Sequence, residues 1–502
     1  MQPLIEAFVT LFTGVHFWLM IGGALLGLLV GALPGLGGGM AIALLLPLTY
    51  SMDPGMAVVL LITAYGANPL GGSIPAILIN TPGSGENAST TLDGYPLAKQ
   101  GKAGIAIGAV MMSSALGTII GFIALIFLIP FSREIVLAFS YPEFFMMALF
   151  GLTVIVMVTK GNRGKGMIAA GFGLLFSFVG REPVNGSSRF TFHNIHLEDG
   201  LAVVAVVIGL MALGEAISLY AKNETVSKND ENMKVDGILK GFWEAFRHWG
   251  VTLRSSIIGI IIGAVPGVGG QVAGFLAYGQ AAQFSKHPER FGKGAVEGVI
   301  ASEASHNAKE AGSFLPTLAF GIPGSSAMAI LLGGLILHGI SPGPEMMLRN
   351  LDVVYLLMVA WMVGGIVTAI AGSIAGKYLV FITKVPSQYI APAIIFLTII
   401  GVYSLKQSMV DVFVLVFFGM LGFQMKKYGF PRVAMVIGFV LGSLTEISFQ
   451  QTVSGMGYLG FFTRPFSLIL LILTLVAFFY PSWQSRRQAK KLQKPWQDEN
   501  VS

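Results

Sequence analysis

Two stretches of the chain are rich in side chains that can hold a small polar ligand. One runs from Tyr65 to Pro96 and the other from Glu303 to Met328, and both mix hydroxyls and amides with Gly and Pro. Hydroxyls, amides and the free N–H groups at the start of a helix suit an anion, and carbonyls of the same segments suit a cation. The composition of these stretches therefore predicts a site for a small carboxylate held with a coupling ion. The expected substrate-binding residues are Asn68, Ser73, Thr81, Ser84, Asn307, Ser325 and Ser326.

Two Gly-Pro motifs, GALPGLGG at Gly31 to Gly38 and GAVPGVGG at Gly263 to Gly270, interrupt apolar sequence. Pro lacks an amide hydrogen and Gly tolerates positive φ, so each motif should break its helix and leave backbone groups without partners. At membrane depth such groups must face protein or a water-filled cavity. The residues expected to bind an ion or to shape the loop backbone are Gly35, Gly37, Gly38, Gly267, Gly269 and Gly270.

These motifs form part of an internal repeat. The Gly-Pro motif recurs at an offset of 232 residues, and Pro75 followed by Pro82-Gly83-Ser84 recurs at an offset of 241 as Pro316 followed by Pro323-Gly324-Ser325. Close helix packing explains any one of the small residues equally well. Two anchors in the same order indicate a duplicated fold, and paired broken segments are typical of a transport site.

Charged residues inside the second polar stretch have two interpretations. Glu303, Lys309 and Glu310 surround His306 and Asn307. Charges inside a membrane domain usually serve function, whereas the same residues in a loop that reaches water would pair and be solvated. Both interpretations stay open at this point.

The segment FHNIHLED places His193 and His196 close to Glu198 and Asp199. A metal site is conceivable there, but a polar loop between spans is the preferred interpretation, and no metal site is predicted. Arg181, Arg189, Arg349 and the pair Lys160 and Arg163 are interpreted as loop charges.

The elements that position these residues must be membrane helices. The chain has 502 residues, of which 54% are hydrophobic and 11% are charged, where a soluble chain carries roughly 25% charged residues. Several runs without charge, such as 7–52 and 105–130, exceed the roughly 20 residues that span a bilayer. This excludes an ordinary soluble enzyme, and the absence of Cys excludes disulfides, thiolate catalysis and Cys-ligated metals.

The predicted fold is an all-α polytopic membrane protein with about 10–12 transmembrane helices. Its two homologous halves contain broken or re-entrant Gly/Pro-rich segments, and inverted repeats are favoured by analogy with other transporters. The expected parts are a first repeat over 1–220, a polar linker over 221–247, a second repeat over 248–480 and a basic tail over 481–502. In the linker, Trp243 to Trp249 suits an amphipathic segment at the membrane interface.

The tail carries five basic residues after the last apolar run. Basic flanks mark the cytoplasmic side of a membrane, so we expect the C-terminus to be cytoplasmic and expect no role in binding nucleic acid. These residues are Arg486, Arg487, Lys490, Lys491 and Lys494.

Other function classes lack their motifs. The sequence has no HExxH, no nucleophile elbow, no paired aspartates within a span and no Walker A motif. We therefore expect no enzyme activity and no cofactor, and transport that draws on an ion gradient or a separate ATPase. A channel is compatible with the hydropathy, but channel filters usually repeat around an oligomeric axis, whereas this repeat lies within one chain.

Several motifs together resemble the large membrane subunit of the tripartite tricarboxylate transporters, the TctA family. They cover roughly residues 15–480 and are GALPGLGGG, LGGSIPAIL, TLDGYPLAKQGKAG, GAVPGVGG, EASHNA, LPTLAFGIPGSSAMAILLGGL and HGISPGPEMM. The chain departs from the family pattern at Leu70, where a Tyr is usual, and at Lys309 and Glu310, where small residues are common.

The resemblance implies a secondary transporter in the bacterial inner membrane. It would work with a small four-span membrane subunit and a periplasmic solute-binding protein. Its substrates would be citrate and other tri- or dicarboxylates, driven by a sodium or proton gradient. A stand-alone ion-coupled carrier is the alternative, followed by a channel or an integral membrane enzyme.

Overall fold

The computed structural model describes residues 2–33, 37–158, 163–222, 235–266, 269–383 and 387–492. Within these ranges the chain is helical except for loops and one short hairpin, in which β1 (Gly180–Arg181) pairs antiparallel with β2 (Ser188–Arg189). Seven of the described helices are long and apolar enough to cross a bilayer, and shorter apolar helices accompany them. The prediction of an all-α polytopic membrane protein is confirmed, while the number of spans stays a prediction.

The first half of the chain begins with a broken helix and ends at the linker. Its helices, including the short 3-10 turns η1 to η3 and the π-helical turn η4, are α1 (Gln2–Phe12), α2 (Val15–Ala32), α3 (Gly38–Leu45), η1 (Leu46–Thr49), α4 (Pro54–Leu78), η2 (Glu86–Ala88), α5 (Thr91–Lys99), α6 (Ala103–Ala138), α7 (Tyr141–Val158), α8 (Arg163–Ser177), η3 (Ile195–Leu197), α9 (Val203–Ile208), η4 (Gly209–Leu213) and α10 (Gly214–Lys222).

The second half starts with the same order of elements, a broken helix followed by a long buried one. Its helices, including the 3-10 turn η5 and the π-helical turn η6, are α11 (Ile238–Arg247), α12 (Trp249–Gly263), α13 (Gly269–Gln283), η5 (Pro288–Arg290), α14 (Val296–Phe314), η6 (Leu315–Ala319), α15 (Ser326–Leu337), α16 (Pro344–Arg349), α17 (Leu351–Thr383), α18 (Ser387–Lys406), α19 (Met409–Lys427), α20 (Arg432–Met456), α21 (Gly460–Thr463) and α22 (Pro465–Leu492).

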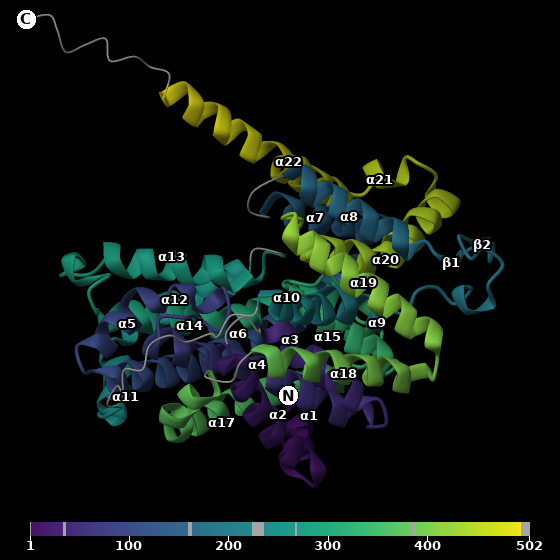
Figure 1. Cartoon of the computed structure of the whole chain (residues 1–502). Coiled ribbons are helices and arrows are strands. Elements are labelled where there is room, and N and C mark those ends of the chain that lie inside the picture. The colour runs from purple at the N-terminus through teal and green to yellow at the C-terminus, as the bar shows by residue number, and fades with distance from the viewer. Residues whose placement is uncertain are drawn as a thin grey trace, which may run out of the picture.

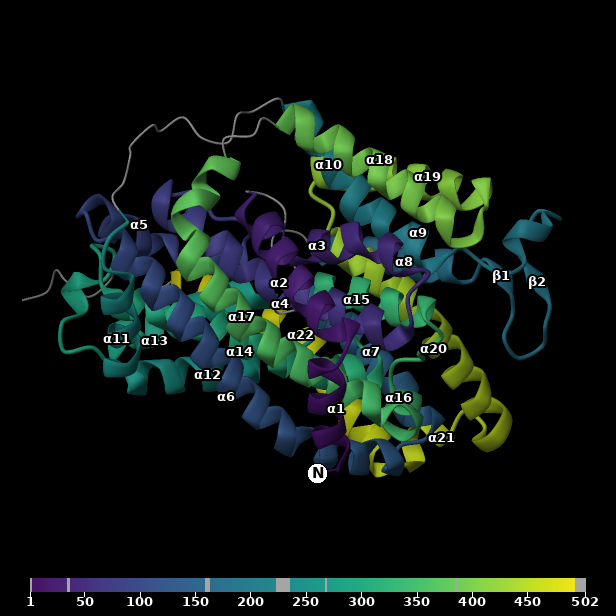
Figure 2. The same cartoon turned by 90° about the horizontal axis from the view of Figure 1, so that it is seen from below.

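The helices are arranged in two parts. Figure 1 shows α7, α8, α19, α20 and α22 on one side of a larger body that contains α2, α4, α6, α12, α14 and α17. Seen from below in Figure 2, the two longest helices of the body, α6 and α17, run side by side, and the two pack against each other. The β1–β2 hairpin projects from the edge of the molecule in both views. The body therefore contains both Gly-Pro breaks and both polar stretches.

Two buried helices form the centre of the body. α4 is buried from Ala57 to Leu78, and α14 is buried from Gly298 to Phe314, with the burial continuing through most of η6. Because lipid cannot satisfy polar groups, helices that carry many of them must be enclosed by others. α2, α3 and α17 cover α4, whereas α6, α12 and α13 cover α14.

Glycines bring these helices together in the same way in both halves. A Cβ on Gly27 would collide with the carbonyl oxygen of Ala64, and a Cβ on Gly259 would collide with that of Ser305. The glycines differ by the 232-residue offset and their partners by the 241-residue offset. Small residues let membrane helices approach closely, and here the close approach recurs at the offsets of the sequence repeat. This packing supports the proposal of two homologous halves.

The positions of the helix breaks agree only partly with the sequence. α2 ends at Ala32 and α3 begins at Gly38, and α12 ends at Gly263 and α13 begins at Gly269, as the Gly-Pro motifs predict. Pro75, however, lies inside α4, and Pro316 opens the π-helical turn η6. Neither Pro75 nor Pro316 ends a helical stretch. The stretch that contains Pro75 ends at Leu78 and the one that contains Pro316 ends at Ala319, and a Pro-Gly-Ser turn follows each of them.

The C-terminal end of the predicted linker forms a helix that packs on the body. Residues 238–247 form α11, which packs on α6 because Gly241 fits against the backbone around Ile105 and Gly108. Gly241 and Ala245 are its buried residues, whereas Leu239, Trp243 and Phe246 are exposed, and a position at the membrane interface stays a prediction. Residues 223–234 lie outside the described ranges.

Candidate functional site

The two Gly-Pro breaks and the two Pro-Gly-Ser turns meet around one cavity of about 330 Å³. These segments come from four separate parts of the chain, and the packing of α4 and α14 at the centre of the body brings them together. Six of the residues predicted for the site line this cavity, and they are Gly37, Gly38, Ser84, Gly269, Gly270 and Ser325.

Three helices begin at the wall of this cavity. α3 begins at Gly38, α13 begins at Gly269, and α15 begins at Ser326 directly after its N-cap Ser325. The first N–H groups of a helix have no partner within the helix and carry its positive dipole end. Three such ends directed at one cavity make it a favourable place for an anion.

The glycines at the two breaks are not equivalent. Gly269 has a φ of 76°, which an L side chain rarely adopts, whereas Gly37 has a φ of −66° and a ψ of 172°, which any residue adopts. The expectation of a positive φ therefore holds for Gly269 and not for Gly37. Gly270 has a second reason to be glycine, because a Cβ there would lie 2.6 Å from the carboxyl carbon of Glu86.

Charged side chains from α10 and α20 reach the same cavity. Arg432, in the first turn of α20, and Glu215, in the first turn of α10, both line it. Arg432 Nη2 lies 2.7 Å from Glu215 Oε2, and Lys426 Nζ lies 2.5 Å from Glu215 Oε1. The sequence analysis missed both cavity residues, because each is an isolated charge next to an apolar run and belongs to no motif.

A second group of charges connects the cavity to α14. Tyr65 and Glu86 line the cavity, Lys309 Nζ lies 3.2 Å from Glu86 Oε1 and 2.9 Å from Glu310 Oε1, and the Tyr65 hydroxyl donates to Glu310. Lys309 and Glu310 are 0% and 1% exposed. They therefore do not lie in a loop that reaches water, and the interpretation as buried charges is correct.

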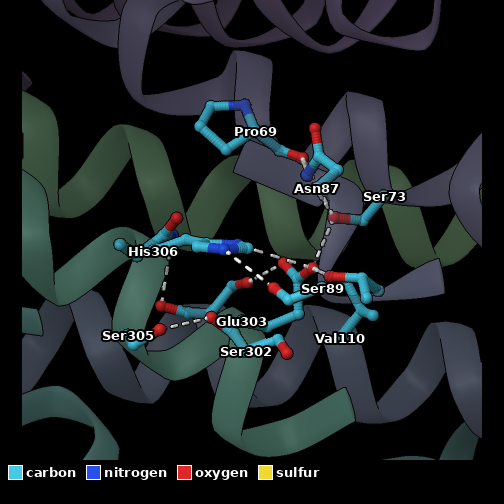
Figure 3. A network of polar contacts seen from close by, with 12 residues as sticks. Pro69, Ser73, Asn87, Ser89, Val110, Ser302, Glu303, Ser305 and His306 are labelled. Carbon is cyan, nitrogen blue, oxygen red and sulfur yellow. Dashed lines mark hydrogen bonds and ion pairs between the residues drawn. The ribbon is translucent and has the colours of Figure 1, made fainter. Parts of the chain in front are cut away.

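Ser73 and Asn307, predicted to lie in loops of the site, instead lie within α4 and α14. Ser73 Oγ donates to Glu303 Oε1 at 2.6 Å, and Asn307 Nδ2 donates to Thr118 Oγ1 at 3.0 Å. Figure 3 shows Ser73 directed at Glu303, with His306 beside the carboxylate. Both predicted residues belong to a buried polar network rather than to the cavity wall.

The remaining predicted residues have varied positions. Asn68 is buried on α4 next to the cavity residue Pro69, and the Thr81 hydroxyl donates to the carbonyl of Ile79 at 3.2 Å. Ser326 is the first residue of α15. Gly35 and Gly267 lie outside the described residues.

The histidine segment is an exposed loop between β2 and α9. His193 and His196 are both exposed, and within the part of the chain that the structure describes no three His, Cys, Asp or Glu side chains are grouped as a metal site would require. Arg189 differs from an ordinary loop charge, because its Nη2 lies 2.7 Å from Oε1 of Glu446, whose side chain is 8% exposed.

Comparisons with known proteins agree with the motifs. The family model described as "Tripartite tricarboxylate transporter TctA family" matches residues 17–437. An Agrobacterium vitis protein described as an "Uncharacterized 52.8 kDa protein in TAR-I ttuC' 3'region" is 33% identical over 492 residues, with 96% of each chain covered. A second protein of that organism, described as an "Uncharacterized protein in TAR-II ttuC' 3'region", is 32% identical over 235 residues, which are 46% of this chain and 97% of the relative. No solved structure matches.

Proposed function

The chain belongs to the tripartite tricarboxylate transporter TctA family, and on that premise we propose that it carries small tri- or dicarboxylates across the bacterial inner membrane as the large subunit of a three-part transporter. A sodium or proton gradient drives the uptake. The partners are a small four-span membrane subunit and a periplasmic solute-binding protein that delivers the substrate. The lipid bilayer surrounds the outer helices.

The main support for this proposal is that three helix starts and Arg432 converge on a single cavity. Its volume of about 330 Å³ is within the roughly 300–1,000 Å³ of known ligand sites. A carboxylate placed there would lie beside the first turns of α3, α13 and α15. Broken helices that direct their N-terminal ends at an anionic substrate are a recurring device of secondary transporters.

Arg432 is suited to hold one carboxylate of the substrate. Its guanidinium pairs with Glu215 through Nη2 and donates to the carbonyl of Leu210 through Nη1 at 3.3 Å. A guanidinium presents five N–H donors in a fixed plane, so donors remain for a bound carboxylate. Lys426 contacts the other oxygen of Glu215, which keeps Glu215 partnered when Arg432 turns toward the substrate.

Several features of the cavity suit alternating access. It lies between the body and the part that contains α20, because Arg432 and Glu215 approach it from one side and the Gly-Pro breaks from the other. A substrate that bridges the two sides is released when they move relative to each other, which is the rocking that repeat-built transporters use.

The proposal is tested by uptake into proteoliposomes that contain this chain with its membrane subunit. Labelled citrate, malate and succinate are supplied with and without the periplasmic binding protein, and we expect uptake only when that protein is present. Uptake that is the same without it would show a stand-alone carrier instead.

The site itself is tested with Arg432→Gln and with Arg254→Gln as a matched control, since Arg254 is exposed on α12. A hydrogen bond to a charged group contributes roughly 1.5–3 kcal/mol, so Arg432→Gln should weaken the apparent affinity by about ten- to a hundredfold. Arg254→Gln should leave it unchanged. Normal affinity in the Arg432 variant would place the carboxylate elsewhere.

A further inference from the structure

A buried carboxylate lies outside the cavity, and its hydrogen-bond donors are hydroxyl groups. Glu303 is 0% exposed on α14. Its Oε1 accepts hydrogen bonds from Ser73 at 2.6 Å and from Thr90, and its Oε2 accepts one from Ser114 at 3.2 Å. These three donors come from α4, the start of α5 and α6, so three separate segments of the fold converge on one carboxyl group.

The ionisable group that lies beside Glu303 is a buried histidine. His306 Nδ1 lies 3.8 Å from Glu303 Oε1, beyond hydrogen-bond distance, and has no hydrogen-bond partner although the ring is 0% exposed. His306 Nε2 lies 3.4 Å from Ser89 Oγ. A buried polar atom without a partner is costly, and this unpartnered nitrogen lies beside a buried carboxylate.

Glu303 is the first of three charged groups that act on His306. Lys309 on α14 and Glu86 on η2 are the further charged groups, and they pair with each other. From α13, Gly274 lies directly against the ring, where any side chain would collide with Nε2. The pair is therefore enclosed on every side by helices that contribute hydroxyls, backbone or charges that already have partners.

A chain of hydrogen bonds joins this carboxylate to the cavity. Ser84, which lines the cavity, donates from Oγ to Asn87 Oδ1 at 2.9 Å, Asn87 Nδ2 donates to Ser73 Oγ at 2.8 Å, and Ser73 donates to Glu303. Asn87 Nδ2 also contacts the carbonyl of Pro69, another residue of the cavity wall, at 2.8 Å. Two side chains, Ser73 and Asn87, thus connect Glu303 to the cavity residue Ser84.

Ser73 can respond to the protonation state of Glu303. A hydroxyl has one hydrogen to donate and two lone pairs to accept, and Ser73 Oγ has two acceptors within reach, Glu303 Oε1 at 2.6 Å and Pro69 O at 3.1 Å. When Glu303 is ionised, Ser73 donates to it. When Glu303 carries a proton, its O–H donates to Ser73, and Ser73 turns its hydrogen to Pro69 O at the cavity wall.

We propose that Glu303 is the site at which the transporter binds the proton that it moves together with its substrate, with His306 as the buried base beside it. This inference rests on the proposed function and assigns the coupling ion and its site. The ion is assigned as a proton because Ser73 Oγ lies 2.6 Å from Glu303 Oε1, a separation at which two oxygens share one hydrogen, and because His306 Nδ1 beside the carboxylate has no partner. The proton enters from the side of high proton concentration, neutralises Glu303 and leaves on the other side.

The test uses the complex with its membrane subunit and binding protein in proteoliposomes, with labelled citrate, malate and succinate and the membrane potential clamped at zero. For one proton per substrate, an inside-alkaline gradient of one pH unit supports about tenfold accumulation. We expect the wild type to accumulate substrate on this gradient in sodium-free buffer. Accumulation on a sodium gradient alone, with no response to the pH gradient, would overturn the inference.

Glu303→Gln keeps the shape and the acceptor oxygen of the side chain but cannot release a proton. We expect this variant to lose accumulation on the pH gradient while it still exchanges internal for external substrate, a reaction that needs no net proton movement. A merely structural role would reduce both. Glu297→Gln, at the start of the same helix, is the matched control and should keep both activities.

Two further outcomes are decisive. If Glu303→Gln exchanges no substrate, an internal pH dye on the wild type decides, because addition of substrate in sodium-free buffer must acidify the vesicle interior if a proton enters with it. An unchanged internal pH during uptake overturns the proton assignment. If the wild type exchanges none of the three carboxylates, the proposed function fails, whereas exchange without proton movement contradicts only the inference about Glu303.

Discussion

Removal of the Lys309 ammonium tests whether the buried charges near the cavity are a balanced group. Lys309 Nζ lies between Glu86 Oε1 and Glu310 Oε1, at 3.2 Å and 2.9 Å, and the lysine side chain is 0% exposed. Lys309→Met keeps most of the length of the side chain and removes its charge. Two carboxylates then face each other without a cation, and Glu310, at 1% exposure, has no access to solvent.

The expected loss is large. Removing one partner of a buried ion pair costs about 3–5 kcal/mol, which is a sizeable part of the roughly 5–15 kcal/mol by which proteins are stable. We expect Lys309→Met to yield little folded protein, and the folded fraction to melt at a clearly lower temperature in detergent than the wild type. Fluorescence-detected size exclusion and a thermal unfolding series measure both quantities.

A second substitution separates charge from packing. Glu310→Gln on the Lys309→Met background removes the deeper carboxylate and leaves an amide oxygen that the Tyr65 hydroxyl can still donate to. We expect the double variant to melt at a higher temperature than Lys309→Met alone. Wild-type stability of Lys309→Met, or a double variant that is no more stable than the single one, would refute the view that these charges hold one another in place.

Three shorter predictions concern the cavity, the break and the tail. Ser84→Ala should weaken the apparent substrate affinity by about tenfold in uptake assays at matched expression, whereas His193→Ala, in the exposed loop, should not change it. Gly269→Ala should lower the free energy of unfolding by roughly 1–2 kcal/mol, because Gly269 has a positive φ. Gly37→Ala should leave this free energy unchanged. Equal effects of the two substitutions would contradict the difference between the breaks. A phosphatase fused after Ser502 should be inactive and a fluorescent protein there should be bright, because basic flanks stay in the cytoplasm.

The fold class and part of the site could be predicted because they depend on local features. Uncharged runs predict membrane helices, and Gly-Pro motifs predict helix ends, since both follow from the chemistry of the residues themselves. Ser84 and Ser325 could be assigned to a common site because each belongs to a repeated motif. Residues outside the motifs could not be placed in this way.

Arg432 and Glu215 show why the rest was missed. They belong to α20 and α10, and they reach the cavity only because these helices pack beside the body. Ser73 shows the opposite error, since it lies in a motif and looks like a ligand residue but lies inside α4 and points to Glu303. A hydroxyl side chain suits a substrate, a carboxylate partner or a packing role equally well, and only the tertiary structure decides among them.

The two Gly-Pro breaks carry one further conclusion. Gly37 and Gly269 occupy the same place in the repeated motif, yet one is extended and the other has a positive φ. Equal sequence therefore does not impose equal conformation at the breaks, and the same motif is compatible with both.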